Sequence, residues 1–222
     1  MRTLAVIALK GGSGKTTVAT HLALAAHLRG QDALLLDMDR QRSALNILSA
    51  RPETGPEMAA SSGPKLLSAK FAAVARGKRL LVIDTPAGAV EDVSEAIVLA
   101  DIAVMVVRPT LLDLAGLAPT LSLVRGLQKP STVVLSQAPA PEDGVESPLV
   151  RRALRALDYM RAPLAPVTLR ARTAFQTALE TGRSVEETQD PAAAAEIAAL
   201  WEHVEGMLAW AAEEDLPPPA QP

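Results

Sequence analysis

The chain has 222 residues, which suits one α/β domain, and its 49 % hydrophobic and 21 % charged residues exclude a wholly disordered protein. It contains no cysteine, which excludes disulfides, thiolate metal sites and cysteine-ligated iron–sulfur clusters. Its net charge of −3 means that any binding to nucleic acid must come from a local basic patch and not from the overall field.

Short apolar runs without polar alternation predict strands that are buried on both faces. They cover residues 4–9, 33–37, 80–84, 102–107 and 132–136. Apolar residues at helical spacing predict helices over about 15–29, 65–76, 90–100, 113–127, 148–160, 171–181 and 192–214. Strands that alternate with helices in this way indicate an α/β protein, with a mostly parallel twisted sheet and helices on both faces.

Stretches rich in glycine and proline predict surface loops over residues 51–64 and 138–148. We expect one domain over residues 1–213, followed by a disordered or extended proline-rich tail over residues 214–222. The first apolar run does not resemble a removable signal peptide, and no run reaches the roughly 18 apolar residues that span a bilayer. A cytoplasmic location is therefore expected.

Residues 10–17 read Lys-Gly-Gly-Ser-Gly-Lys-Thr-Thr and lie between the first predicted strand and the first predicted helix. This context is that of a phosphate-binding loop, because glycines let backbone N–H groups surround phosphates while the helix points its N-terminus at them. Lys15 is expected to reach the β- and γ-phosphates of ATP, and the Thr16 hydroxyl to ligate Mg²⁺. The alternative is a glycine-rich turn with incidental lysines. The predicted nucleotide contacts in this loop are Gly11, Gly12, Ser13, Gly14, Lys15, Thr16 and Thr17.

The loop departs from the ordinary P-loop pattern, which has glycine five positions before Gly14, where this chain has Leu9. It carries a second lysine, Lys10, at the next position. The run Lys-Gly-Gly-Ser-Gly-Lys-Thr resembles the deviant Walker A motif of the ParA/MinD family of P-loop ATPases. The resemblance implies that Lys10 reaches across an ATP-bound homodimer to the partner's nucleotide, where a cation stabilises charge on the transferred phosphoryl group.

Carboxylates follow two of the predicted strands. The carboxyl ends of parallel strands surround the ligand site, so Asp37, Asp39 and Asp84 are expected near the phosphate loop. The resemblance implies that Asp39 orients the attacking water and that Asp84 holds Mg²⁺ directly or through water. The family usually has proline after the second aspartate, where this chain has Arg40, so slow hydrolysis is expected. The alternatives are an exposed acidic turn for Asp39 and a helix N-cap for Asp84. The predicted catalytic residues are Lys10, Lys15 and Asp39.

Contacts to the adenine base are expected after the later strands. In relatives, the loops that follow late strands surround the base, and here these loops contain Arg108 and Pro109 after one strand and Gln137 after the next. The Gln137 amide can both donate and accept hydrogen bonds, as recognition of a base requires.

A cluster of arginines lies on a predicted helix and beyond it. Arg151, Arg152 and Arg155 share a helical face, and Arg170 and Arg172 follow in a segment, residues 168–187, that resembles the C-terminal part of ParA-type proteins. Such a cluster neutralises DNA phosphates without reading sequence. The alternative is a solvated helix face with local ion pairs.

The leading hypothesis is a small ParA-like ATPase without an N-terminal DNA-binding domain. Bound MgATP would drive homodimerisation and non-specific DNA binding at the nucleoid, and hydrolysis to ADP, accelerated by a ParB-like adaptor, would release it. The cargo would be a plasmid, a chromosome region or another large assembly. Two alternatives remain: a membrane switch like MinD, although the C-terminus is acidic and rich in proline, and an ATP-dependent amide ligase of the cobyrinate or dethiobiotin synthetase type.

Overall fold

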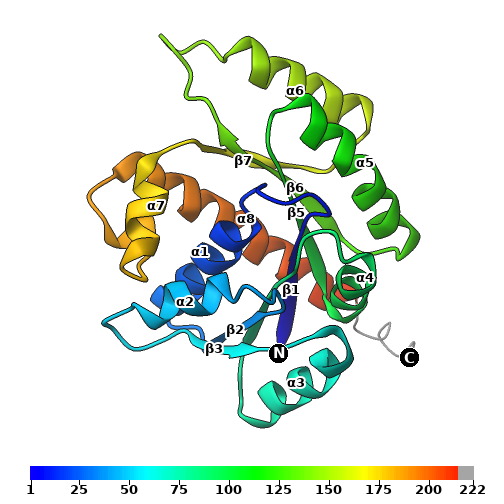
Figure 1. The fold of residues 1–222 in the computed structure, drawn as a ribbon, viewed down its shortest axis with the longest axis vertical. Helices are drawn as coiled ribbons and strands as arrows, with labels where there is room; N and C mark the ends of the chain where they lie inside the picture. The colour runs from blue at the N-terminus through cyan, green and yellow to red at the C-terminus, as the bar shows by residue number, and fades with distance from the viewer. Residues whose placement is uncertain (215–222) are drawn as a thin grey trace, which may run out of the picture.

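The computed structural model describes residues 1–214, which fold into a sheet with helices on both faces (Figure 1). Within this part of the chain, seven parallel strands form one sheet in the order β3-β2-β4-β1-β5-β6-β7. The strands are β1 (Arg2–Ile7), β2 (Ala33–Asp37), β3 (Glu57–Ala60), β4 (Leu80–Asp84), β5 (Ile102–Val107), β6 (Ser131–Ala138) and β7 (Leu164–Arg170). The helices are α1 (Lys15–Leu28), α2 (Ser43–Ser49), α3 (Gly63–Ala75), α4 (Val90–Leu99), α5 (Leu111–Gly126), α6 (Pro148–Tyr159), α7 (Thr173–Glu180), the 3-10 helix η1 (Val185–Glu187) and α8 (Pro191–Glu214).

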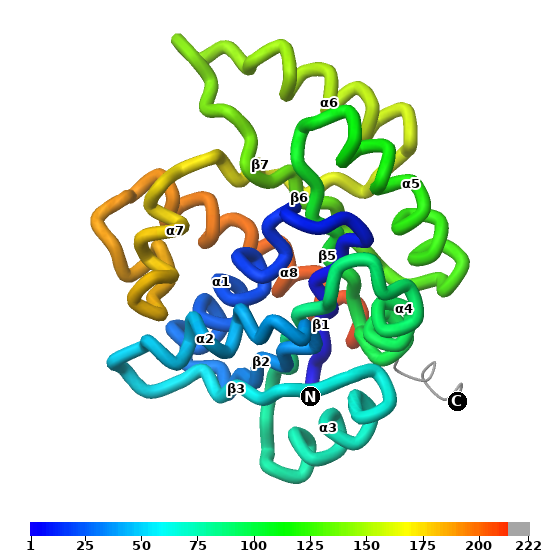
Figure 2. The backbone as a smooth tube through the Cα atoms, viewed as in Figure 1, coloured from blue at the N-terminus to red at the C-terminus, as the bar shows by residue number. Residues whose placement is uncertain are grey.

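Side chains that alternate along each strand divide the core into two layers. On one face of the sheet, Leu4 and Val6 belong to a buried cluster with α1, α2, α7 and α8. On the other face, Ala5 and Ile7 pack with α3, α4, α5 and α6. The tube in Figure 2 shows α1 beside α8, although the two helices lie at opposite ends of the sequence. Because both faces are covered, the strands are apolar without alternation, as the sequence predicts.

The central position of β1 determines where a ligand can bind. Strand β1 lies between β4 and β5. From β1 the strand order continues through β4 toward β3 on one side and through β5 toward β7 on the other, so the loop after β1 emerges where the strand order reverses. Open α/β sheets bind ligands at this position, outside the carboxyl ends of the strands. The register pairs Asp84 of β4 with Val6 of β1 and with Asp37 of β2, which brings both carboxylates to the same edge.

Helix α6 illustrates how the sequence sets both the start and the orientation of a helix. The Ser147 side chain accepts a hydrogen bond from the Val150 N–H, and proline occupies the first helical position, where no N–H is needed. Val150, Ala153 and Leu157 are buried at helical spacing. The opposite face of α6 is therefore left to polar and charged side chains.

The predicted α/β fold with a parallel sheet is confirmed, and four elements were not predicted, namely β3, β7, α2 and the 3-10 helix η1. The expectation of a loop over residues 51–64 is wrong in part, because residues 57–60 form the edge strand β3. Its residues are only partly buried and include no β-branched side chain, so pairing with β2 decides its conformation. Strand β7 contains a proline and pairs irregularly with β6, as an edge strand can. The short helix α2 was also missed.

The C-terminal helix α8 packs along the sheet and ends the described part of the chain. Trp201 and Leu208 are buried in the core, whereas Trp210 is half exposed, so only two of the three pack fully on the domain. Helix α8 continues to Glu214, one residue past the predicted domain boundary, and the rest of the predicted proline-rich tail lies outside the described residues. Among the described helices, none is both long enough and apolar enough to cross a membrane.

Candidate nucleotide-binding site

The glycine loop between β1 and α1 has the backbone conformation of an anion cradle. Gly12 and Gly14 have φ angles of 76° and 98°, a region that side chains disfavour. A Cβ atom at Gly14 would lie 3.0 Å from the Ser136 Oγ and 3.3 Å from the Gln137 Nε2, so glycine also permits this close approach. The first turn of α1 carries no acidic residue and no side-chain cap, which leaves its N–H groups available to an anion.

Lys15, the first residue of α1, is buried beneath this loop, with 7 % of its surface exposed. Burial lowers the pKa of the Lys15 ammonium, while the carboxylates of Asp84 and Asp39 act in the opposite direction. A buried cation next to free N–H groups and two carboxylates indicates a site for a highly charged ligand together with a cation.

Asp84 ends β4 directly beneath the loop. Both oxygens of its carboxylate are buried and lack a hydrogen-bond partner. Burial raises the pKa of Asp84 to about 7; the Thr16 hydroxyl, close by but not hydrogen-bonded, and Lys15 oppose this rise. A buried carboxylate without a hydrogen-bond partner destabilises the fold unless a bound ligand interacts with it. Carboxylate and hydroxyl oxygens are the ligands that Mg²⁺ prefers. The residues present thus fit a Mg²⁺ ion bound between Thr16 and Asp84.

The turn after β2 holds Asp39 near this carboxylate. The two oxygens of Asp37 accept hydrogen bonds from the backbone N–H groups of Asp39, at 2.9 Å, and Leu45, at 3.2 Å. Arg42, which sequence reasoning did not identify, donates to the Asp37 carbonyl at 2.7 Å. Asp37 therefore shapes the turn. Asp39 is only partly buried, and Arg40, in the place of the family's proline, is exposed to solvent.

At the other end of the glycine loop, Lys10 is held by a carboxylate of its own chain. The Lys10 Nζ lies 3.2 Å from Asp113 Oδ1, and the Asp113 side chain is 2 % exposed. Arg108 and Thr110 also donate to this carboxylate. Burial alone would raise the pKa of Asp113, but the hydrogen bonds from Thr110, Arg108 and Lys10 outweigh it and hold the pKa below its ordinary value. Sequence reasoning missed Asp113, whose only local signal is the capping pattern Thr110-x-x-Asp113 at the start of α5.

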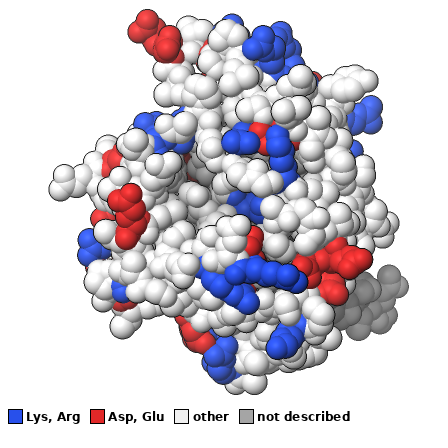
Figure 3. Space-filling model, viewed as in Figure 1, with Lys and Arg blue, Asp and Glu red and all other residues white. Residues whose placement is uncertain are grey.

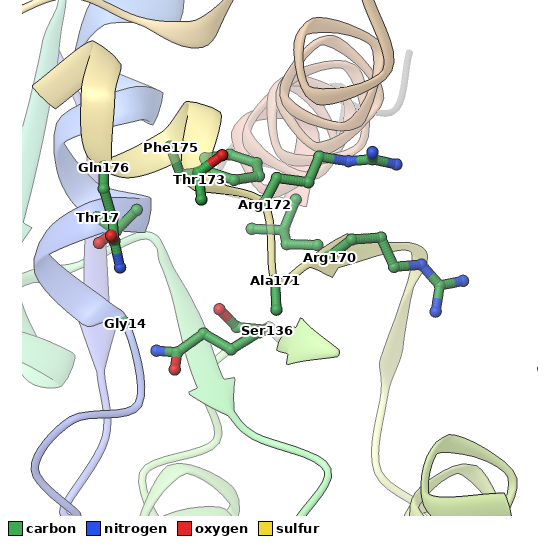
Figure 4. Close-up of a pocket in the computed structure, with 11 residues that line it drawn as sticks. Gly14, Thr17, Ser136, Arg170, Ala171, Arg172, Thr173, Phe175 and Gln176 are labelled. Atoms are coloured by element: carbon green, nitrogen blue, oxygen red, sulfur yellow. The ribbon is translucent and has the colours of Figure 1, made fainter. Parts of the chain in front are cut away.

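A cavity of about 250 Å³ opens beside the glycine loop (Figure 4). Gly14 and Thr17 line one side, Ser136 and Gln137 the end of β6, and residues 169–176 the far side. The Phe175 ring meets His21 of α1 edge-on, with ring centroids 5.3 Å apart. This partly enclosed space, lined by both apolar and polar residues next to the phosphate loop, has the position and lining that suit a nucleotide base.

Of the three predicted base contacts, one lines this cavity and two do not. Gln137 lines the cavity, and its Nε2 donates to the Gly12 carbonyl at 3.1 Å. Arg108 instead donates to Asp113, and neither it nor the buried Pro109 lines the cavity. The reason is that the cavity opens between β6 and α7, whereas Arg108 follows β5 on the side of α5. The lining at residues 169–176 comes from the packing of α7 and has no motif that would reveal it.

The arginine cluster divides into an exposed group and a paired group. Arg151, Arg152 and Arg155 are exposed on α6, where Figure 3 shows basic side chains at the surface. Arg170 forms an ion pair with Glu146, and Arg172 pairs with Glu196 at 2.9 Å. In Figure 4 the guanidinium groups of both point away from the cavity. Each of these two arginines already has a carboxylate partner, unlike the three on α6, and their contact with DNA stays a prediction.

The fold and this site define a P-loop nucleotide-binding protein. The CbiA family, the CobQ/CobB/MinD/ParA nucleotide binding domain, matches residues 4–200, and the chain belongs to this family. The fold is similar to that of a variant of McdA from Cyanothece in complex with ATP, with a TM-score of 0.77, 17 % identity and coverage of 92 % of this chain and 96 % of that chain. It is also similar to the cell division ATPase MinD of Pyrococcus furiosus, with a TM-score of 0.70, 21 % identity and coverage of 93 % and 99 %.

A short segment of the chain is also similar in sequence to a curated protein. Over 54 residues the chain is 43 % identical to a putative replication protein A of Rhizobium rhizogenes. The matched segment is 24 % of this chain and 13 % of that protein, so the likeness is confined to a small part of the relative.

Proposed function

We propose that the protein is a ParA-like ATPase switch that binds MgATP, dimerises, associates with DNA without sequence preference and is released by hydrolysis to ADP. One observation carries the proposal: the glycine loop has a lysine at each end, and its buried Lys15 faces the unpartnered Asp84 carboxylate. Relatives in fold are named as an ATPase and as an ATP complex, which supports ATP as the ligand.

In this proposal each residue of the site has a separate role in ATP hydrolysis. Lys15 and the N–H groups of the loop bind the phosphates, while Thr16 and Asp84 would hold Mg²⁺, which would supply positive charge to the phosphate oxygens. Asp39 accepts a hydrogen bond from the water that attacks the γ-phosphorus. Lys10 of the second protomer stabilises the charge that develops as the bond to the leaving ADP oxygen breaks. Gln137 and the cavity beside α7 hold the base.

Two exposed leucines support a dimer that closes over the nucleotide. Leu111 and Leu112 begin α5 and are 81 % and 72 % exposed, although such side chains are usually buried. They adjoin Asp113, which contacts Lys10, so they lie beside the phosphate loop. A second copy that covers the nucleotide would also cover these leucines and gain their burial.

The exposed face of α6 supports binding to DNA. Arg151, Arg152 and Arg155 point to solvent without an acidic partner among the described residues. In a protein of net negative charge, such a patch neutralises phosphates locally and leaves the rest of the surface unattractive to DNA. The cargo would be a plasmid, a chromosome region or another large assembly, and a ParB-like adaptor would stimulate hydrolysis.

The experiment that tests this function measures assembly and DNA binding together. Molecular mass by light scattering, and binding to random-sequence DNA, are measured with MgADP and with MgATP at two salt concentrations. We expect a monomer with ADP, a dimer with ATP, and DNA binding only by the dimer, weakened by salt. A dimer that binds no DNA would redirect the proposal to a protein or membrane surface, and a monomer in ATP would reject the switch.

A further inference from the structure

The turn that carries Asp39 is closed by the side chain of Arg42, to which the proposed function gives no role. The Arg42 Nη1 donates to the Asp37 carbonyl, at the end of β2, at 2.7 Å, and to the Ser61 carbonyl, just after β3, at 3.4 Å. The Asp37 carbonyl also accepts from the Ser61 N–H at 3.0 Å. The guanidinium therefore spans the ends of two paired strands, which the sheet holds in place.

The backbone of Arg42 has a conformation that arginine disfavours. Its φ angle is 55°, in the left-handed region, where glycine lies without strain. Arg42 is the N-cap of α2, and its carbonyl accepts from the Asn46 N–H at 2.9 Å. A strained residue persists only where its surroundings hold it, and here the side chain makes the holding contacts. The guanidinium is the part of this residue that a glycine would lack.

Asp39 is held from both ends of this turn. Its N–H donates to Asp37 Oδ1 at 2.9 Å, and its carbonyl accepts from the Arg42 N–H at 3.1 Å. Its carboxylate Oδ1 accepts from the Gln41 N–H at 2.9 Å, which leaves Oδ2 for a water molecule. The direction of the carboxylate therefore depends on how Arg42 is placed relative to Asp37.

We propose that Arg42 is a positioning residue for ATP hydrolysis, which acts through Asp39. Its guanidinium binds the Asp37 carbonyl, closes the turn of residues 37–42 and so keeps the Asp39 carboxylate aimed at the attacking water. This inference rests on the proposed function, because it takes from there the role of Asp39. The turn contains no proline that would restrict its backbone, so the hydrogen bonds of Arg42 supply that restriction.

The test measures turnover and nucleotide affinity separately. Asparagine tolerates the left-handed region, but in Arg42→Asn the side chain is too short to reach the Asp37 carbonyl. The rate constant for single-turnover hydrolysis of MgATP should fall about tenfold, because misplacement of a reacting group by about 1 Å can cost up to about 100-fold. Affinity for a non-hydrolysable ATP analogue, measured by calorimetry, should change less than about twofold, since Lys15 and the glycine loop bind the phosphates.

Two further variants separate the hydrogen bonds from other effects of the change. One nitrogen of Arg42 makes both contacts, so Arg42→Lys keeps a suitable donor and should hydrolyse ATP within about threefold of the parent rate. Arg40→Gln is the matched control, because it removes an exposed arginine of the same turn, and it should keep the parent rate. An unchanged rate in Arg42→Asn, or an equal fall in Arg42→Lys or Arg40→Gln, would overturn the inference.

A double-mutant cycle gives a readout that a merely structural role would not produce. In a chain with Asp39→Ala there is no carboxylate to position, so Arg42→Asn should lower the remaining rate less than about twofold. The same tenfold loss in both backgrounds would reject the coupling. If Arg42→Asn does not fold, Arg42→Gly, which suits the left-handed backbone, carries the same expectation. Failure of the proposed function is distinguishable, because in that case Asp39→Ala alone hydrolyses ATP at the parent rate.

Discussion

At the residue scale, the site depends on charged groups that are buried before any ligand arrives. Lys15 and Asp84 are both almost fully covered, and neither has a complete set of partners within the chain. Lys15→Ala removes the cation that faces the phosphates, so we expect ATP affinity measured by calorimetry to fall about 100-fold. Lys65→Ala, at an exposed lysine of α3, is the control and should bind as the wild type does. Equal affinities of the two variants would reject the phosphate-loop assignment.

A second prediction at this scale concerns His21, which is fully buried behind the base cavity. Burial lowers its pKa from 6.5 to about 4, against the hydrogen bond that its Nδ1 makes to the Thr17 carbonyl. The unfolded chain therefore takes up a proton below pH 6.5 and the folded chain only below about 4, so stability falls as pH falls through this window. Between pH 7.5 and 5 this group alone should remove about 2 kcal/mol of the free energy of unfolding.

The measurement compares urea unfolding of the wild type and of His21→Gln at the two pH values. The glutamine side chain of this variant does not titrate, so the variant should lose about 2 kcal/mol less than the wild type over this interval. Equal losses would show that the ring takes up a proton as easily in the folded chain as in the unfolded one.

At the element scale, α6 presents the basic face on which DNA binding is proposed. Replacement of Arg151, Arg152 and Arg155 together by glutamate should abolish binding to random-sequence DNA in MgATP, while the dimer still forms. Replacement of all three by glutamine instead should reduce the slope of log affinity against log salt by about 2 to 3 for each protomer, because about 0.9 counterions are released per phosphate contact. Arg183→Gln, at an arginine already paired with Glu53, is the control and should leave this slope unchanged. Unaltered DNA affinity of the triple variant would move the DNA site off α6.

Elements also differ in how far the sequence reveals them. Strands β1, β4 and β5 are continuous apolar runs because helices cover both faces, so composition alone predicts them. Strand β3 is a partly exposed edge, and its pairing with β2 is a tertiary effect that no local pattern shows. The same contrast holds in the site. The sequence reveals the glycine loop because its backbone needs glycine, whereas Asp113 reaches Lys10 only because the start of α5 lies beside this loop.

At the scale of the whole molecule, the question is which surface a second copy covers. The N-terminal end of α5 combines two highly exposed leucines with Asp113, which contacts Lys10, so these leucines adjoin the lysine that the proposed function sends to the second protomer. Several exposed apolar side chains also lie on α3, among them Leu67 at 51 %, but α3 is on a different part of the molecule (Figure 1). The two helices therefore offer a paired comparison.

Leu111→Glu combined with Leu112→Glu should prevent dimerisation in MgATP and leave nucleotide binding by the monomer intact. Full burial of each leucine is worth about 1.5 to 3 kcal/mol and a symmetric dimer buries four, so we expect the dissociation constant to rise at least about 100-fold. Light scattering measures the mass, and a fluorescent ATP analogue measures nucleotide affinity. Leu67→Glu places the same change at an exposed leucine of α3, and this variant should dimerise as the wild type does. If the Leu111→Glu, Leu112→Glu variant still dimerises and Leu67→Glu does not, the partner packs against α3. Lys10 could then not reach the nucleotide of a second protomer.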